Sequence, residues 1–426
     1  MAMMRSLLDH GANPNVNSKD GHTALDISVR EEAWDAVHLL VTAGAEVNQV
    51  LTSGGRYGSA LTTACYWNRG DIVRLLIEYK ANPNFQGGEA GSALQAACCR
   101  ESINIVKLLL EYGADPNIQG GEYGCALQAA CNQNNMELVE LLLEYKTDPN
   151  VQGGKYGSAL QAACYQEHMG LIKLLLEYNA DTNVQGGEYG SALYAACHKD
   201  NIEIVQLLLE HQADPKIPAH TRLGLNDMHG SALDAACYRG SIDMVKLLLE
   251  WKVSPNIQGG QYGTALQVAC YRNRREEIIQ LLLENQADPN IQAGCYGTAL
   301  QAACSRQSFD IVKLLLEKYH ADPNIEGGEQ GTPLHIAYYR RDMQIVELLL
   351  EHKADPNIQG GTHGSVLHAA VYGGDEDFVY FLLQHGANAN IKGPKGMTAL
   401  EIAQEYGYDE ISQLILDHDI KSESES

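Results

Sequence analysis

The sequence lacks the segments that would carry a chain into a membrane or out of the cell. No apolar run reaches the roughly 18 residues of a membrane span. The opening MAMMRSLLDH has no apolar core before a small-residue cleavage site. No Asn-x-Ser/Thr glycosylation site occurs, and the eleven cysteines are an odd number. Because such a composition favours a reducing compartment, we expect a cytoplasmic or nuclear protein that is not secreted.

Positive charge is scarce as well. The chain has 30 Lys and Arg against 54 Asp and Glu, a net charge of −24. Nucleic acids and anionic membranes both require a dominant positive field, so we expect neither as a partner.

Motifs for catalysis are also missing: H-E-x-x-H, G-x-S-x-G, the Walker phosphate loop and the C-x-x-C of a zinc site do not occur. The segment GGKYGSA at 153–159 only superficially resembles a phosphate loop. Its Lys precedes the second glycine group, and the copies at 120–126 and 186–192 carry Glu there. We therefore expect no enzyme, no cofactor and no metal.

What the sequence has in abundance is repetition. Triplets of small residues, such as those beginning at Ser92, Cys125 and Ser158, recur mostly every 33 residues. Each is followed by a short segment such as ALQAACY, a polar loop, and an amphipathic segment such as LIKLLLEY. A hydroxyl before the first segment suits a helix N-cap, and Gly113 suits the end of the second helix. The Gly-Gly doublet allows a hairpin-like finger, and the period predicts a helical solenoid.

These units resemble the ankyrin repeat. TPLHIA at 332–337, DGHTALDIS at 20–28 and IVKLLLEYGADPN at 105–117 carry the resemblance, which extends from residue 1 to about 418. It implies an all-α solenoid of about twelve stacked helix-turn-helix repeats with hairpin-like fingers. The QGGEYGSALQAAC form is similar to fungal arrays that often lie downstream of NACHT-type nucleotide-binding domains.

The resemblance also divides the chain. Residues 1–17 read as an incomplete repeat with a second helix only, either because the chain is a fragment or because MAMM caps the stack. Residues 18–418 form the array, with an extended finger at 215–230, and residues 419–426 form an acidic, Ser-rich tail that we expect to be disordered.

The cysteines and two histidines read as structural residues. Eight cysteines hold one place in the repeat: Cys65, Cys98, Cys131, Cys164, Cys197, Cys237, Cys270 and Cys304. Stacked helices lie about 8–10 Å apart, too far for the roughly 7 Å limit of a disulfide, so we expect free, buried thiols. Cys99, Cys125 and Cys295 fall outside this set, and Cys295 is the expected exposed thiol. The resemblance implies that His335 and His368 hydrogen-bond between turns.

Aromatic and basic residues gather directly after the cysteines, whereas eight copies of LLLE place acids at the ends of the second helices. In an ankyrin-like stack, the end of the first helix, where these aromatic and basic residues fall, lines the concave groove. Tyr and Arg are enriched at binding hot spots. We predict a partner-binding groove lined by Tyr66, Trp67, Arg100, Tyr165, Lys199, Tyr238, Arg239, Tyr271, Arg272, Arg306, Tyr339, Arg340 and Tyr372. The alternative is structural: the cations complement helix dipoles and the rings cover neighbouring helices.

A second set of rings falls at the fingertips. Its members are Tyr57, Tyr123, Tyr156, Tyr189, Tyr262 and Tyr296. Their regularity favours a ladder that packs finger against finger, although their hydroxyl edges are free to face a ligand.

We therefore predict a monomeric, non-enzymatic scaffold whose basic groove binds protein partners and favours acidic segments. Two alternatives stay open. One is the ligand-sensing C-terminal part of a truncated NACHT-type signalling NTPase, and the more distant one is a tailoring protein or enzyme of fungal secondary metabolism.

Overall fold

The computed structural model describes residues 1–19, 21–50, 57–217, 230–272, 275–327 and 330–425. Within these residues the chain forms 25 helices and no strand longer than an isolated bridge. After α1 (Ala2–Asp9), the helices follow one another as twelve pairs, α2/α3 to α24/α25. The expected all-α architecture of about twelve helical repeats is confirmed. Most of the extended finger expected at 215–230 falls outside the described residues.

Each pair has a short first helix of seven or eight residues and a second helix of nine residues, apart from the 17-residue α25. The first helices are α2 (Ala24–Arg30), α4 (Ala60–Tyr66), α6 (Ala93–Cys99), α8 (Ala126–Asn132), α10 (Ala159–Tyr165), α12 (Ala192–Lys199), α14 (Ala232–Arg239), α16 (Ala265–Tyr271), α18 (Ala299–Ser305), α20 (Pro333–Tyr339), α22 (Val366–Tyr372) and α24 (Ala399–Tyr406). The second helices are α3 (Trp34–Thr42), α5 (Gly70–Glu78), α7 (Ile103–Glu111), α9 (Met136–Glu144), α11 (Met169–Glu177), α13 (Ile202–Glu210), α15 (Ile242–Glu250), α17 (Glu276–Glu284), α19 (Phe309–Glu317), α21 (Met343–Glu351), α23 (Glu376–Gln384) and α25 (Asp409–Glu425).

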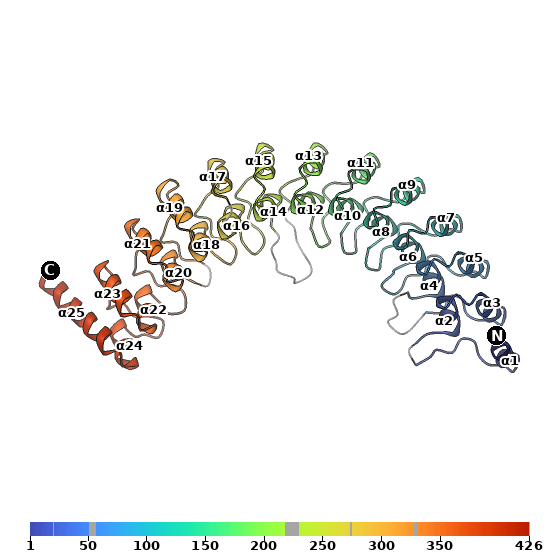
Figure 1. The fold of residues 1–426 in the computed structure, drawn as a ribbon, viewed down its shortest axis with the longest axis horizontal. Helices are drawn as coiled ribbons and strands as arrows, with labels where there is room; N and C mark the ends of the chain where they lie inside the picture. Colours follow the sequence, from blue (N-terminus) through green and yellow to red (C-terminus); the bar gives the residue numbers. More distant parts are fainter. Residues whose placement is uncertain (20, 51–56, 218–229, 273–274, 328–329, 426) are drawn as a thin grey trace. The chain divides into compact units, whose positions relative to one another are not determined.

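The chain divides into two compact units, residues 1–224 and 225–426. Within each unit the first helices form one row and the second helices another, and the fingers extend beyond the first row (Figure 1). Stacking of successive repeats buries the apolar faces of both rows, so each unit has one continuous core.

The first helices are built for close approach. Ser158 Oγ accepts a hydrogen bond from the backbone amide of Gln161 (3.2 Å), which caps α10 as its sequence predicts. Ala162, Ala163 and Cys164 are fully buried, and all eight cysteines that hold this place in the repeat are free and buried as expected. Burial raises the pKa of these thiols, Cys164 among them, far above the ordinary value, so they stay protonated. Cys295 is exposed, as predicted.

Glycines allow each finger to fold back. Gly120 and Gly124 form an antiparallel bridge, and Gly121 between them has a φ of +62°. A Cβ on Gly121 would lie 2.7 Å from the carbonyl oxygen of Glu89 in the preceding finger. Neighbouring fingers therefore pack with their backbones in direct contact, which a larger residue would prevent.

A buried side chain ties each first helix to the next finger. Gln95 Nε2 donates to the carbonyl oxygens of Ile118 (3.1 Å) and Gly124 (2.9 Å), while Gln95 Oε1 accepts from the Ser92 amide (2.6 Å). The same joint is made by Gln128, Gln267 and Gln301. Gln161 makes only the donor half, since its Nε2 donates to the carbonyl of Gly186 (3.1 Å) while its Oε1 is buried and has no hydrogen-bond partner in the described residues. At His335 and His368 an imidazole takes over this role. Their Nε2 atoms donate to the carbonyls of Gly364 (2.8 Å) and Ile391 (3.1 Å), which confirms the expected contact between turns.

The two ends of the chain differ from the inner repeats. None of the residues of α1 is buried. At the other end, α25 continues to Glu425, so residues 419–425 are helical where the sequence predicts a disordered tail. Among the described side chains of α25, Ile415 is the last buried one, and local backbone hydrogen bonds can continue a helix past it.

Candidate partner-binding face

In unit 1 the predicted groove and fingertip residues meet in one stack. Tyr156 and Tyr189 come from successive fingers, and Tyr165 is the last residue of α10. The Tyr165 ring lies between the two finger rings, with centroids 5.5 Å from Tyr156 and 4.7 Å from Tyr189. Lys199, at the end of α12 in the next repeat, places Nζ 4.3 Å from the centre of the Tyr165 ring. The residues of this cluster lie far apart in the sequence. They meet because each finger returns to the end of its own first helix.

The same arrangement occurs earlier in unit 1. The Tyr57 ring packs on Tyr66 at 4.8 Å, and Trp67 meets Tyr66 edge-on at 5.9 Å. The Arg100 guanidinium of the next repeat lies 4.9 Å from the Tyr66 ring centre. Trp67 remains 37% exposed, so its ring offers contact area to a partner.

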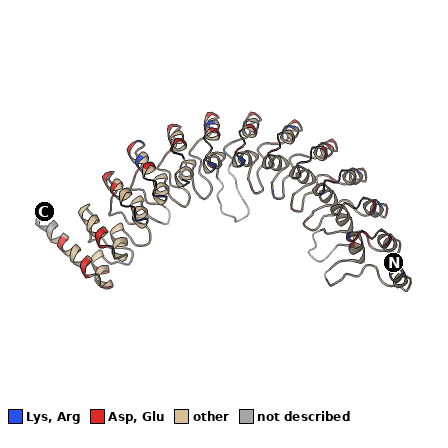
Figure 2. Cartoon of the chain, viewed as in Figure 1, with Lys and Arg blue, Asp and Glu red and all other residues tan. Residues whose placement is uncertain are grey.

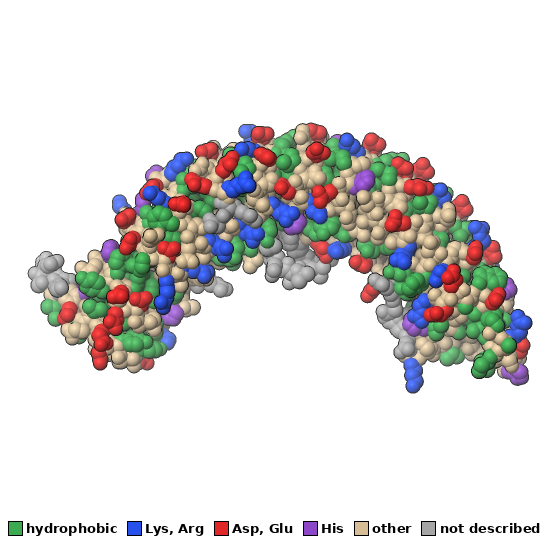
Figure 3. Space-filling model, in the orientation of Figure 1, with side chains coloured by type: hydrophobic (Ala, Val, Ile, Leu, Met, Phe, Trp, Pro, Cys, Tyr) green, Lys and Arg blue, Asp and Glu red, His purple; other side chains and the backbone are tan. Residues whose placement is uncertain are grey.

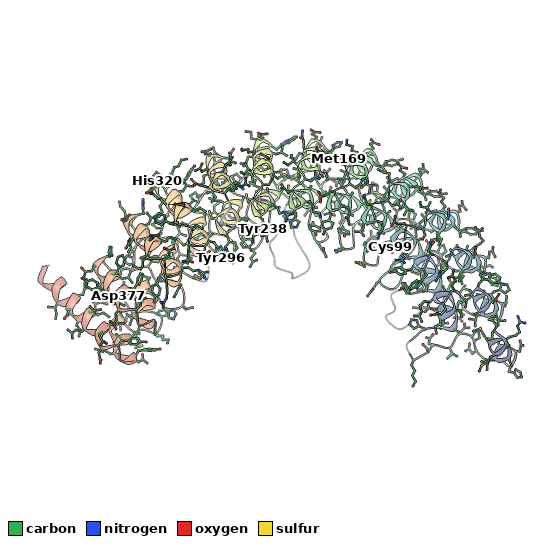
Figure 4. All side chains as sticks on the ribbon, in the orientation of Figure 1. Cys99, Met169, Tyr238, Tyr296, His320 and Asp377 are labelled. Atoms are coloured by element: carbon green, nitrogen blue, oxygen red, sulfur yellow. The ribbon has the colours of Figure 1, made fainter. Side chains whose placement is uncertain are left out.

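Unit 2 repeats the pattern. Tyr271 packs on Tyr262 at 4.9 Å and on Tyr296 at 4.3 Å. Arg306 lies 5.1 Å from the Tyr271 ring centre, and Arg272 lies 4.1 Å from that of Tyr238. Figure 4 places Tyr238 and Tyr296 on the finger side of this unit, away from the row of second helices.

At the end of unit 2 a histidine takes the place of a finger tyrosine. Tyr339 Oη lies 3.0 Å from His363 Nδ1, and the His363 ring packs against Tyr372 at 5.1 Å. Lys395, from the last finger, lies 5.2 Å from the Tyr372 ring centre. Lys395 was missed by the sequence reasoning, because its finger has no tyrosine or Gly-Gly doublet to align it with the others.

We call these stacked rings and their cations the tyrosine–cation ladder. In the described residues it comprises Tyr57, Tyr66, Trp67, Arg100, Tyr156, Tyr165, Tyr189, Lys199, Tyr238, Tyr262, Tyr271, Arg272, Tyr296, Arg306, Tyr339, His363, Tyr372 and Lys395. Each cation over a ring contributes about 0.5–1 kcal/mol when exposed and more when desolvated. The ladder therefore joins successive repeats within a unit.

Burial favours the neutral form of four finger tyrosines in the ladder. Burial, then the neighbouring Tyr165 and Tyr123 hydroxyls, raise the pKa of Tyr156 to about 12. Burial also raises the pKa of Tyr189, Tyr262 and Tyr296, with adjacent tyrosines adding to the effect. Near neutral pH these hydroxyls are therefore protonated and able to donate hydrogen bonds.

Three predicted residues lie outside these stacks. Arg239 and Arg340 are exposed, and neither makes an ion pair or ring contact in the described part of the chain. Tyr123 is half-buried at its fingertip and interacts with neighbouring groups.

Charges separate between the two rows, but incompletely. Acidic residues, red in Figure 2, are frequent on the second helices of both units. Two cations after the first helices are already paired: the predicted Lys199 places Nζ 3.6 Å from Glu167 Oε1, and Arg69 Nη1 meets Glu32 Oε2. Glu32 occupies the matching loop of the first complete repeat and was overlooked from the sequence.

Two negative findings concern the described residues alone. No group of three or more His, Cys, Asp or Glu side chains lies close enough together to hold a metal ion. None of the helices in the described ranges combines the length and apolar character that crossing a membrane requires.

Comparison with known proteins supplies the family. No curated protein matches the chain. A family model described as "Ankyrin repeats (3 copies)" matches residues 49–120, 126–219, 219–293, 266–360 and 358–425. Ankyrin repeats are typically non-catalytic and suggest a protein-binding scaffold. The helix pairs, the fingers between them and these matches over most of the sequence show that the chain belongs to the ankyrin-repeat family.

Proposed function

We propose that the chain is a scaffold that binds acidic segments of a partner protein on the tyrosine–cation ladder and the exposed arginines beside it. The observation that supports this proposal is the repeated placement of cations over half-buried tyrosines, as with Lys199 on Tyr165 and Arg272 on Tyr238. The rings are held by their neighbours before any partner arrives, so little side-chain entropy is lost on binding. Arg239 and Arg340 remain available for direct charge pairing.

The division between paired and exposed arginines sharpens the test. From the sequence, charge reversal at Arg239, Arg272 and Arg306 together is expected to weaken binding without lowering the melting temperature. However, Arg272 and Arg306 lie over rings, so their reversal also removes contacts between repeats. Reversal at Arg239 and Arg340 separates the two effects.

We expect Arg239→Glu with Arg340→Glu to weaken binding of an Asp/Glu-rich peptide about tenfold, measured by fluorescence anisotropy, with an unchanged melting temperature. Lys146→Glu with Lys252→Glu is the matched control, because both lysines are exposed at the ends of second helices. Equal binding by the two variants would contradict the proposal. Cross-linking mass spectrometry on a captured partner should place its contacts on the ladder.

We also propose that the repeats belong to the fungal subtype found downstream of NACHT domains. The Gly-Gly-x-Tyr-Gly fingers support this finer assignment. Transcript reads that continue upstream of Met1 into a nucleotide-binding domain would establish the sensor role, and reads that end in an untranslated leader would argue against it.

A further inference from the structure

We propose a second interaction surface in unit 1, on the opposite row of helices, that binds an extended basic segment of a partner. Its core is the Glu–Tyr row, which we define as the last residue of each of four successive second helices and the tyrosine that follows. The row comprises Glu78–Tyr79, Glu111–Tyr112, Glu144–Tyr145 and Glu177–Tyr178. It adds a surface to the ladder proposed above and does not depend on it.

All four tyrosines of this row are exposed, whereas Tyr339 is the one ladder tyrosine in the described residues that exposes as much (40%). Tyr79, Tyr112, Tyr145 and Tyr178 expose 39%, 52%, 42% and 44% of their surface. In the described residues none of them packs against another ring or beneath a cation. A single exposed aromatic residue is ordinary, but the same position filled by an exposed ring in four consecutive repeats forms a continuous strip.

The scaffold beneath the row is fixed by hydrogen bonds between repeats. Asn84 Nδ2 donates to the carbonyl of Gly113 (3.0 Å), and Asn84 Oδ1 accepts from the Asp115 amide (2.7 Å). Gly113 and Asp115 follow Tyr112 in the chain. Asn117 and Asn150 make the equivalent bonds to the next repeats. The spacing of the four tyrosines is therefore set by the backbone, and the row is ordered before a ligand binds.

The charge around the row is strongly negative. The segments 78–82, 111–115, 144–148 and 177–181 contain seven carboxylates and two lysines, a net charge of −5 (2 − 7). The carboxylates are all exposed: Glu78, Glu111, Asp115, Glu144, Asp148, Glu177 and Asp181. Acidic side chains are also visible along this rim in the space-filling view (Figure 3). A ring next to a carboxylate offers a cation two favourable contacts at once.

The spacing of the row selects the form of the ligand. Helices of adjacent repeats lie about 8–10 Å apart, and three residues of an extended chain span about 10 Å. An extended segment with a cation at every third residue would therefore place one cation on each repeat. Arginine fits best, because its planar guanidinium stacks on a tyrosine ring and pairs with a carboxylate.

Unit 2 provides an internal control. At the same helix ends it has Trp251, Asn285, Lys318, His352 and His385. These residues do not form a row of one type, and Lys318 adds a positive charge. We therefore expect the basic ligand to bind unit 1.

The test uses the full chain and a fluorescent peptide of four Arg-Ser-Ser triplets, with fluorescence anisotropy as the readout. We expect Tyr79→Ala, Tyr112→Ala, Tyr145→Ala and Tyr178→Ala together to weaken binding roughly thirtyfold or more. The corresponding Glu→Gln changes in the row should weaken binding at low salt and reduce its dependence on salt, because they remove the carboxylates that salt screens. Trp251→Ala with His352→Ala and His385→Ala is the matched control and should leave affinity unchanged. Since all the row side chains are exposed, thermal unfolding of the variants should follow the parent chain.

Three outcomes would overturn the proposal. A peptide of the same composition with its arginines clustered should bind more weakly, so equal affinity would remove the role of spacing. Unchanged affinity of the tyrosine variant would remove the row itself. Self-association of the parent chain that the tyrosine variant abolishes, with no peptide binding, would assign the row to a second copy of this chain.

Discussion

Five repeats carry a glutamine at the third residue of the first helix, and the repeat that opens unit 2 carries Asp234 there. Gln128 represents the four that make the complete joint, since Gln161 Oε1 is buried and has no hydrogen-bond partner in the described residues. Its Oε1 accepts from the Cys125 amide (3.2 Å), and its Nε2 donates to the carbonyls of Val151 and Gly157. Asp234 Oδ2 accepts from the Ser231 amide, but Oδ1 is buried and has no hydrogen-bond partner in the described residues.

The difference shows what the joint requires. In the complete joint, one atom accepts from the helix N-cap and another donates to the following finger. An amide does both, whereas an ionised carboxylate only accepts, so it leaves the finger carbonyls without that donor. A protonated carboxyl restores a donor. Burial favours this protonated form, because it raises the pKa of Asp234 to about 7 despite the opposing hydrogen bonds from Ser231.

The largest expected effect comes from breaking the complete joint. Gln128→Ala leaves the Cys125 amide and the Val151 carbonyl buried without their side-chain partner and opens a cavity between repeats. We expect a loss of about 2–4 kcal/mol in the free energy of unfolding of unit 1, measured by urea denaturation. Gln166→Ala is the control, because the half-buried side chain of that glutamine hydrogen-bonds to Asn132 alone among the described residues. Similar losses in both variants would mean that the joint has no special importance.

The next effect uses pH to change the exceptional joint. Asp234 has a folded-state pKa of about 7 against an ordinary 3.8, so folding favours its protonated form. That stabilisation is fully present below the ordinary pKa and is lost as the pH rises through 7. Between pH 5 and pH 8 we expect the free energy of unfolding of unit 2 to fall by on the order of 2 kcal/mol relative to a variant without this group.

Asp234→Gln supplies the amide found at this place in five other repeats, and it serves as that variant. Its unfolding midpoint should exceed that of the parent chain at pH 8 and approach it at pH 5. Parallel pH profiles for the two chains would contradict the assignment of the proton to Asp234.

The sequence predicted the features that repeat locally. N-caps such as Ser158, the buried cysteines and the contacts of His335 follow from patterns within one or two repeats. The contact of Tyr165 with Tyr189 could not be predicted, because it depends on where the following finger returns. Tyr112 was visible in the repeated LLLEY. Its exposure was missed because an amphipathic pattern does not say which residue past the helix end is covered.

The smallest expected effects concern the residue that follows the C-cap of each second helix. Its type differs between repeats, although the backbone conformation is the same. Gly113 and Lys146 both follow the C-cap tyrosine with positive φ, +81° and +59°. A Cβ on Gly113 would meet no atom within 4 Å, so only backbone strain opposes a side chain there. We expect Gly113→Ala to destabilise unit 1 by about 1 kcal/mol and Lys146→Gly to stabilise it by about 0.5–1 kcal/mol. Chemical denaturation of both variants measures the two changes. If the two stability changes had the same sign, the left-handed backbone conformation would not explain them. The charge of Lys146 would then be the cause of its effect, and Lys146→Gln tests that charge separately.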